Sequence, residues 1–143
     1  MNQPVFIVVA NSAVARLLER SSDAGGWVER ECLVHPGSRL HDNEARGHSI
    51  GGRSGLAPRI DPSEYERVLF SREIASKLQE YVNANQLASF TLFASNPFLG
   101  ELLAHLPDGV KRLVSSHHAT DLTSLSSAEL GDRLAREFHL DSR

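Results

Sequence analysis

The chain has 143 residues, a length that fits one domain able to bury a core without a disulfide or a structural metal. Apolar residues make up 41% and charged residues 23% of the chain, and the formal net charge of −3 excludes a protein that binds nucleic acid through its overall charge. The single cysteine, Cys32, excludes an intramolecular disulfide.

The N-terminal part of the sequence predicts closely spaced strands. Residues 5–10 are all apolar and rich in β-branched side chains, which is typical of a strand buried on both faces. This run is too short to span a membrane and follows no basic leader region, so we expect a cytoplasmic protein. Residues 27–35 alternate and predict a half-exposed strand, whereas residues 13–19 are compatible with either a helix or a strand.

The segment 35–61 is the most unusual part of the sequence. Its 27 residues hold five of the ten glycines, four arginines and three histidines, and they contain no aromatic residue and no periodic apolar face. Loops of this length inside a compact domain are usually functional or disordered. We therefore predict that any discrete functional site of this protein lies in this loop.

A long helix is predicted to follow the loop. Asp61 can cap it, Pro62 suits the first helical position, and Glu64 completes a capping box. The helix is expected to run to about Asn83 or Asn85. Its expected apolar stripe consists of Tyr65, Leu69, Ile74, Leu78 and Tyr81.

The second half of the chain alternates strands and helices. Strands are predicted at residues 90–94 and 110–115, and a short helix is predicted between them, after an Asn96 cap and Pro97. The last helix begins with a capping box formed by Ser126 and Glu129. Alternation of this kind predicts parallel βαβ units, and the early strands predict an antiparallel meander. We expect a single α/β domain over residues 1–143, with a mixed sheet of about five strands and helices packed on it.

Four motifs stand out along the chain: A-N-S-x-x-A-R at residues 10–16, H-P followed by R-L-H-D at the start of the loop, F-L-G-E-L at residues 98–102, and D-L-T at residues 121–123. Together they resemble the bacterial host-attachment protein family, often labelled "protein required for attachment to host cells". The resemblance extends over about residues 5–138 and implies a strand at residues 13–19. The family usually carries Asp where this chain has Asn11, which argues against a function that needs a carboxylate there.

The order of elements is also similar to that of the middle domain of archaeal and eukaryotic peptide-release factors, whose fold resembles ribonuclease H. In those proteins the loop before the long helix carries Gly-Gly-Gln, and the matching place here holds Gly51-Gly52-Arg53. The resemblance implies a translation-associated, RNA-binding protein. A guanidinium has a fixed charge and no acceptor, unlike the glutamine amide that helps to place a hydrolytic water. We therefore favour a non-enzymatic function over peptidyl-tRNA hydrolysis.

The candidate binding residues belong to two groups. In the loop, paired glycines permit close approach of a ligand to the backbone, and arginines suit phosphate groups. Outside it, Asn11 ends the first central strand, where α/β sheets commonly place ligands, and Arg16 can face the same edge; the alternative is that Asn11 only forms an Asx turn. The candidates are Arg39, Arg46, Gly51, Gly52, Arg53, Arg59, Asn11 and Arg16.

No catalytic residue, cofactor or metal site is predicted. The histidines at positions 35, 41, 48, 117 and 118 lack the spacing that converges two metal ligands, and adjacent strand histidines point to opposite faces. Cys32 lies on the apolar face of its expected strand with Val28 and Val34, which predicts a buried, inert thiol. A nuclease is disfavoured because no convergent carboxylates are evident.

Two functional hypotheses remain. The first is a non-enzymatic domain that binds the ribosome, tRNA or another RNA-containing partner through loop 35–61. The second is a protein–protein interaction module that affects host attachment or stress physiology, with the loop as an oligomer or partner interface. We expect neither a membrane nor DNA as a partner.

Overall fold

The computed structural model describes residues 5–20, 26–35 and 62–140 of the chain. These residues form one five-stranded sheet with the strand order β3-β2-β1-β4-β5. The strands are β1 (Phe6–Ala10), β2 (Val14–Arg20), β3 (Trp27–Val34), β4 (Phe90–Ala94) and β5 (Val114–His118). β2 is antiparallel to β1 and to β3, whereas β4 is parallel to β1 and to β5. The predicted single α/β domain with a mixed sheet is confirmed, as is the strand at residues 13–19.

The central strands β1 and β4 are buried on both faces. Every residue of each strand is buried, as the continuous apolar runs predict. Val8 pairs with Leu92, and both face one core cluster; Val9 pairs with Phe93, and both face the other. The sheet therefore separates two hydrophobic cores.

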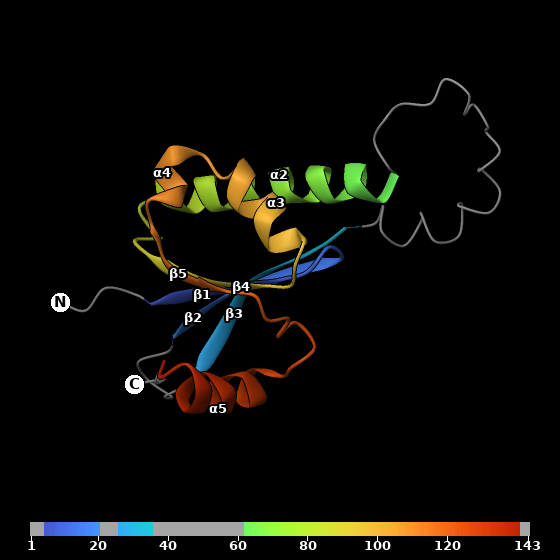
Figure 1. The fold of residues 1–143 in the computed structure, drawn as a ribbon. Helices are drawn as coiled ribbons and strands as arrows, with labels where there is room; N and C mark the ends of the chain where they lie inside the picture. Colours follow the sequence, from blue (N-terminus) through green and yellow to red (C-terminus); the bar gives the residue numbers. More distant parts are fainter. Residues whose placement is uncertain (1–4, 21–25, 36–61, 141–143) are drawn as a thin grey trace, which may run out of the picture.

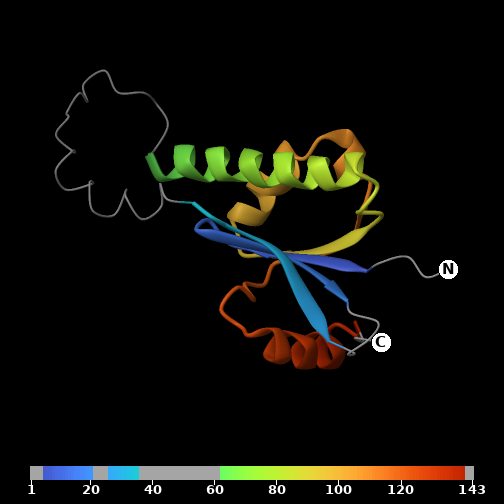
Figure 2. The same ribbon diagram turned by 180° about the vertical axis from the view of Figure 1, so that it is seen from behind.

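Helices cover both faces of this sheet (Figure 1). α2 (Pro62–Asn83), α3 (Phe98–His105) and α4 (Asp108–Lys111) lie on one face, and α5 (Ser127–Glu137) lies on the other (Figures 1 and 2). The larger core lies beneath α2, α3 and α4, and the smaller one lies beneath α5.

Helix α2 begins at Pro62 and ends at Asn83, as expected. Its expected cap, Asp61, lies outside the described residues. Only part of the expected stripe is buried: Ile74 and Leu78 are in the core, whereas Tyr65 is 52% and Leu69 is 37% exposed. The first half of the helix instead buries Phe70, the residue after Leu69. Phe70 faces the end of β3, where its ring stacks on His35.

Helix α5 begins with the predicted capping box. The Ser126 hydroxyl accepts a hydrogen bond from the backbone N–H of Glu129 at 3.1 Å, and the Glu129 carboxylate accepts one from the backbone N–H of Ser126 at 2.9 Å. Leu130 is fully buried in the smaller core, and Leu125 packs against it. The cap and the apolar contacts together define the start of this helix.

Two local predictions in the second half differ from the structure. The strand predicted at residues 110–115 is present but begins later, because Val110 belongs to the short helix α4 and β5 starts at Val114. The carbonyl of Pro107 accepts hydrogen bonds from Val110 and Lys111, and this turn holds Val110 in the core. Asn96 does not cap α3, since the N-cap residue is Pro97 and no side chain bonds the helix start.

Strand β3 also differs from the expected alternation. Val28 is 42% and Val34 is 48% exposed, and Cys32 is exposed rather than buried. Among the described strands β3 has one neighbour, β2, and the pairing between them shifts so that no residue of β2 lies opposite Arg30. This bulge exchanges the two faces of the strand partway along, so the three residues do not share a face.

Candidate functional site

Polar side chains gather at the edge of the sheet where the parallel strands end. Asn11 directly follows β1, and Asp121 and Thr123 lie in the connection from β5 to α5. Arg16 reaches the same place from β2. We call Asn11, Arg16, Asp121 and Thr123 the carboxyl-edge cluster. It joins the A-N-S-x-x-A-R and D-L-T motifs at the edge where α/β sheets commonly bind ligands.

Asn11 connects the turn after β1 to the distant D-L-T motif. Its side-chain oxygen accepts hydrogen bonds from the backbone N–H groups of Ala13 at 2.8 Å and Val14 at 3.0 Å, which closes an Asx turn. Its side-chain nitrogen donates to the carboxylate of Asp121 at 3.0 Å and to the hydroxyl of Thr123 at 3.1 Å. Asn11 therefore forms the turn that the sequence allowed and also holds the chain before α5.

Arg16 ties the same connection to the antiparallel strands. Its Nε atom donates to the Glu29 carboxylate at 2.7 Å, and its Nη1 atom donates to the backbone carbonyls of Thr123 at 2.9 Å and Leu125 at 2.7 Å. Its side chain is only 12% exposed. The guanidinium thus joins β2, β3 and the segment before α5.

Asp121 is the carboxylate of the cluster. Partial burial by itself would raise the pKa of Asp121, but hydrogen bonds from Thr123 and Asn11 outweigh it and hold the pKa below its ordinary value. The Thr123 hydroxyl lies 2.6 Å and its backbone N–H 2.9 Å from one carboxylate oxygen. Asp121 therefore carries its negative charge at neutral pH.

A second polar contact lies where the chain leaves the sheet after β3. His35 is only 8% exposed, and its backbone N–H donates to the carbonyl of Ala13 at 2.9 Å. Its Nε2 atom lies 2.6 Å from a carboxylate oxygen of Glu66 in the second turn of α2, and its ring stacks on Phe70 with centroids 5.0 Å apart. We call His35, Glu66 and Phe70 the loop base.

The loop base joins the two chain segments that border residues 36–61. β3 ends at Val34 and α2 begins at Pro62, and the loop base packs one against the other. The six candidate residues of the loop lie outside the described residues: Arg39, Arg46, Gly51, Gly52, Arg53 and Arg59. The structure thus describes the support of the loop and two candidates elsewhere, Asn11 and Arg16.

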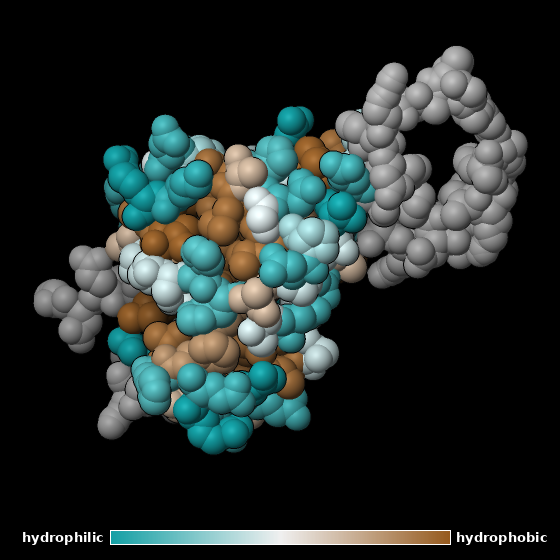
Figure 3. Space-filling view, in the orientation of Figure 1, coloured by the Kyte–Doolittle hydropathy of each residue, from teal (hydrophilic) through white to brown (hydrophobic). Residues whose placement is uncertain are grey.

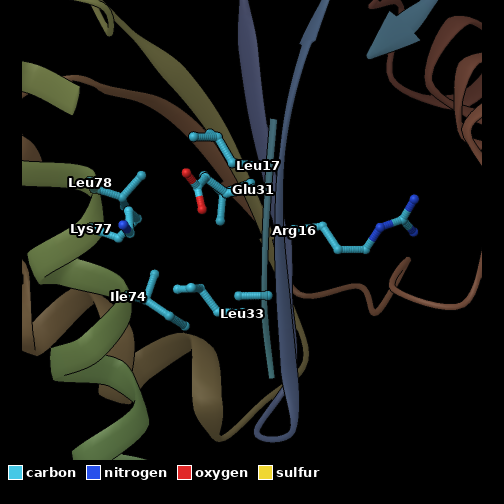
Figure 4. A pocket seen from close by; sticks show the side chains of 9 residues that line it. Arg16, Leu17, Glu31, Leu33, Ile74, Lys77 and Leu78 are labelled. Carbon is cyan, nitrogen blue, oxygen red and sulfur yellow. The ribbon is translucent and has the colours of Figure 1, made fainter. Parts of the chain in front are cut away.

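A small hollow opens between α2 and strands β2 and β3 (Figure 4). Its volume of about 250 Å³ includes space open to solvent, and its walls are mostly apolar. Known small-molecule pockets occupy roughly 300–1,000 Å³. Glu31 and Lys77 line it, whereas the Arg16 side chain points away from it toward the opposite face of the sheet. The hollow is too small to suggest a ligand.

The remaining predicted chemistry falls at separate places. His118 stacks on Phe93 and packs edge-on against Phe138, while His117 is exposed. Cys32 is exposed, and partial desolvation followed by the charge of Glu29 raises the pKa of its thiol, so the reactive thiolate is disfavoured. Among the described residues no group of three or more His, Cys, Asp or Glu side chains could hold a metal ion.

Sequence reasoning missed three residues that complete these contacts. Asp121 and Thr123 stand in a motif that the resemblance already marked, so the motif was their only signal. Glu66 had a weaker one, since it lies one helical turn before Phe70 and shares its face of α2. Neither signal indicates which distant residue, Asn11 or His35, each of these side chains contacts in the folded protein.

Comparisons with known proteins place the chain in a family. None of the helices in the described part is long and apolar enough to cross a membrane. No curated protein matches the chain. The model of one family, described as "Protein required for attachment to host cells", matches residues 6–134, a span that runs from β1 into α5 and includes the whole carboxyl-edge cluster. The chain therefore belongs to this family of host-attachment proteins.

Proposed function

We propose that this host-attachment family protein is a non-enzymatic binding domain of the cytoplasm that engages an RNA-containing partner, such as the ribosome or tRNA, through residues 35–61. The observation that carries the proposal is the loop base. His35 is buried, stacked on Phe70 and hydrogen-bonded to Glu66 at 2.6 Å, so the described residues on either side of segment 36–61 pack against each other. A long segment held in this way suits the presentation of a binding surface.

The charge distribution agrees with a partner rich in phosphate. Residues 35–61 contain four Arg against Asp42, Glu44 and Asp61, a balance of +1, whereas the whole chain has 15 basic and 18 acidic residues, which leaves 11 − 15 = −4 for the remainder. Arginine binds phosphate bidentately and keeps its charge at any physiological pH. The acidic remainder would repel a polyanion, so binding is expected to depend on the segment.

The proposed role includes no hydrolysis. Arg53 stands where the similar release-factor domain carries glutamine, and its guanidinium cannot accept a hydrogen bond from an attacking water. The amide nitrogen of Asn11 is already bonded to Asp121 and Thr123, and its oxygen is used by the turn. A positioned binding segment, without a catalytic group, is the function that these residues support.

Ribosome co-sedimentation at low and high salt tests this proposal. The variant Arg46→Ala/Arg53→Ala/Arg59→Ala is compared with Arg72→Ala/Arg112→Ala/Arg136→Ala, a control that removes the same charge from three exposed positions elsewhere. We expect the loop variant to lose at least tenfold in bound fraction at low salt and to show a weaker salt dependence, because each phosphate contact releases counterions. Equal binding of both variants contradicts the proposal.

A second candidate function, a protein–protein interaction module, is favoured by apolar side chains beside the loop base. Tyr65 is 52%, Leu69 37% and Val34 48% exposed. Exposed apolar residues of this kind suit a protein partner better than an RNA. Replacing residues 39–58 with a short Gly/Ser linker and measuring the molar mass in solution tests the oligomer form of this idea, and an unchanged subunit number counts against it.

A further inference from the structure

The two outer strands of the sheet are protected very differently. The pairing of each strand with its neighbour contains one irregularity, but only β3 carries charged residues in succession, Glu29, Arg30 and Glu31, with ion pairs of 2.7 Å to β2. β5 contains no Lys, Arg, Asp or Glu in Val114–His118, and Ser115, Ser116 and His117 are exposed. Charges and bulges are the usual means by which an edge strand avoids pairing with another chain.

The outer side of β5 is accessible. The described residues place no strand beyond β5 in the sheet order, so its outward backbone groups have no sheet partner among them. The Ser115 hydroxyl donates to the carbonyl of Phe90 on β4 at 3.1 Å, and the shift in pairing lies at this first part of the strand. The stretch from Ser116 to His118 pairs with β4 in regular register.

Apolar surface borders β5 on both sides. Leu113 and Val114 are half-buried against the larger core, and Phe138 packs edge-on against His118 at 4.8 Å on the other side. Figures 1 and 3 look onto this side of the molecule, where hydrophobic surface is visible both above and below the level of the strand. An uncharged edge with apolar borders suits a protein strand rather than a nucleic acid.

We propose that β5 pairs antiparallel with β5 of a second copy of this chain, which makes one continuous sheet across a two-fold axis. The charges that flank β5 favour a second copy of the chain as the partner, and they favour antiparallel over parallel pairing. Lys111 and Arg112 come just before β5 and Asp121 comes just after it. Antiparallel pairing sets the basic start of one copy beside the acidic end of the other, whereas parallel pairing sets like charges together.

This surface is separate from the proposed RNA-binding segment. The loop base follows β3, at the opposite end of the strand order from β5. With a strand spacing of roughly 4.8 Å, the two edges lie about 19 Å apart across the sheet. Pairing through β5 would leave the loop bases of both copies at the outer ends of the joined sheet, so either proposal can fail without the other.

Molar mass in solution tests the pairing. Light scattering of the purified full chain is expected to give twice 15.7 kDa at micromolar concentration. Ser116→Lys/His117→Lys places like charges at the joint and is expected to weaken the dimer at least tenfold. The matched control Val28→Lys/Val34→Lys adds the same charge to exposed positions of β3 and is expected to remain a dimer. A single-chain mass for the unaltered protein, a dimer unaffected by the β5 lysines, or loss of the dimer in both variants would overturn the proposal.

Cross-linking provides a second measurement if the β5 lysine variant fails to fold. In a Cys32→Ser background, Ser116→Cys places one thiol in the middle of β5, close to the proposed axis, and is expected to give a disulfide-linked dimer under mild oxidation. Ser76→Cys, on an exposed position of α2, is the control and is expected to stay monomeric on a non-reducing gel. Equal cross-linking of the two variants contradicts the pairing. The dimer is also expected to survive Arg46→Ala/Arg53→Ala/Arg59→Ala, which separates this result from RNA binding.

Discussion

The carboxyl-edge cluster and the loop base both connect parts of the chain that are distant in sequence, but they differ in how completely their polar atoms are bonded. In the cluster, both side-chain atoms of Asn11 are hydrogen-bonded, and Arg16 makes three bonds. In the loop base, the Nδ1 atom of His35 is buried, and no described residue is hydrogen-bonded to it. Buried polar groups are normally paired.

Among the described residues, this difference distinguishes the cluster, a structural joint, from the loop base, which keeps one buried nitrogen atom unpaired. The cluster resembles a ligand site by its position at the sheet edge, yet Asn11 and Arg16 use their side-chain donors to hold the connection before α5. The loop base is simpler, but it supports the segment that carries most of the candidate binding residues. We therefore expect substitutions in the cluster to affect stability more than binding, and substitutions in the loop base to affect both.

The largest effect is expected for Arg16→Ala. The substitution leaves the Glu29 carboxylate and two backbone carbonyls without their donor, at a side chain that is 12% exposed. Loss of these charge-assisted bonds should lower the free energy of unfolding by about 2–4 kcal/mol. Urea unfolding measures the change, with the exposed Arg136→Ala as control, expected within about 0.5 kcal/mol of the unaltered protein. Similar values for the two variants would show that the cluster is not a structural joint.

Asn11→Asp is expected to have the next largest effect. It brings a second carboxylate within about 3 Å of Asp121 in place of a donor at 3.0 Å, and should cost about 1–3 kcal/mol at pH 7.

The pH dependence of this variant should have the opposite sign to that of the unaltered protein. The folded-state pKa of Asp121 is lowered, so its stabilising contribution is present above the unfolded value of about 3.9 and is lost as the pH falls through the folded pKa. In the variant, mutual repulsion raises the folded pKa of one carboxyl group, so its destabilisation should shrink as the pH falls toward 4. A deficit that is independent of pH between 7 and 4 would contradict this account.

Glu66→Ala tests the loop base. The substitution removes the 2.6 Å contact to His35 and should lower the free energy of unfolding by about 1 kcal/mol, because Glu66 is partly exposed. It should also weaken ribosome co-sedimentation several-fold although no arginine is changed. Glu73→Ala, at an exposed position of the same helix, is the control. Loss of stability with unchanged binding would show that the loop base does not support the proposed binding segment.

Cys32→Ser should have the smallest effect. Cys32 lies opposite Arg16 in the sheet, beside the carboxyl-edge cluster, but it is exposed. Its replacement should change the unfolding free energy by less than about 0.5 kcal/mol. A loss above about 1 kcal/mol would mean that the thiol is buried after all, as the sequence pattern suggested.

The parts of the fold that the sequence predicted well are those determined by residues close together in the sequence. The unbroken apolar runs of β1 and β4 can only be central strands, and Ser126 and Glu129 carry their helix signal within four residues. β3 was misjudged because a bulge at Arg30 depends on its pairing with β2, which alternation along one strand does not reveal. The start of β5 was misplaced because Val110 is equally apolar in a strand and in a one-turn helix.

The candidate site was predictable to the same extent. The position of Asn11 after a central strand indicated the correct edge of the sheet, and Arg16 does reach it. Their partner Asp121 lies 110 residues away in sequence from Asn11, and no periodicity connects them. The contact between His35 and Glu66 likewise depends on the chain returning to the place that it left, which is a property of the fold and not of either local sequence.

The loop base also bears on how freely residues 36–61 can differ between family members. Because His35 and Glu66 hold the ends together, the entropy of closing the intervening chain depends only weakly on its length: each doubling costs about 0.6 kcal/mol. Insertions, deletions and wholesale exchange of the segment therefore carry little penalty for folding. The fold is therefore expected to tolerate changes in the length of this segment while the two cores stay intact.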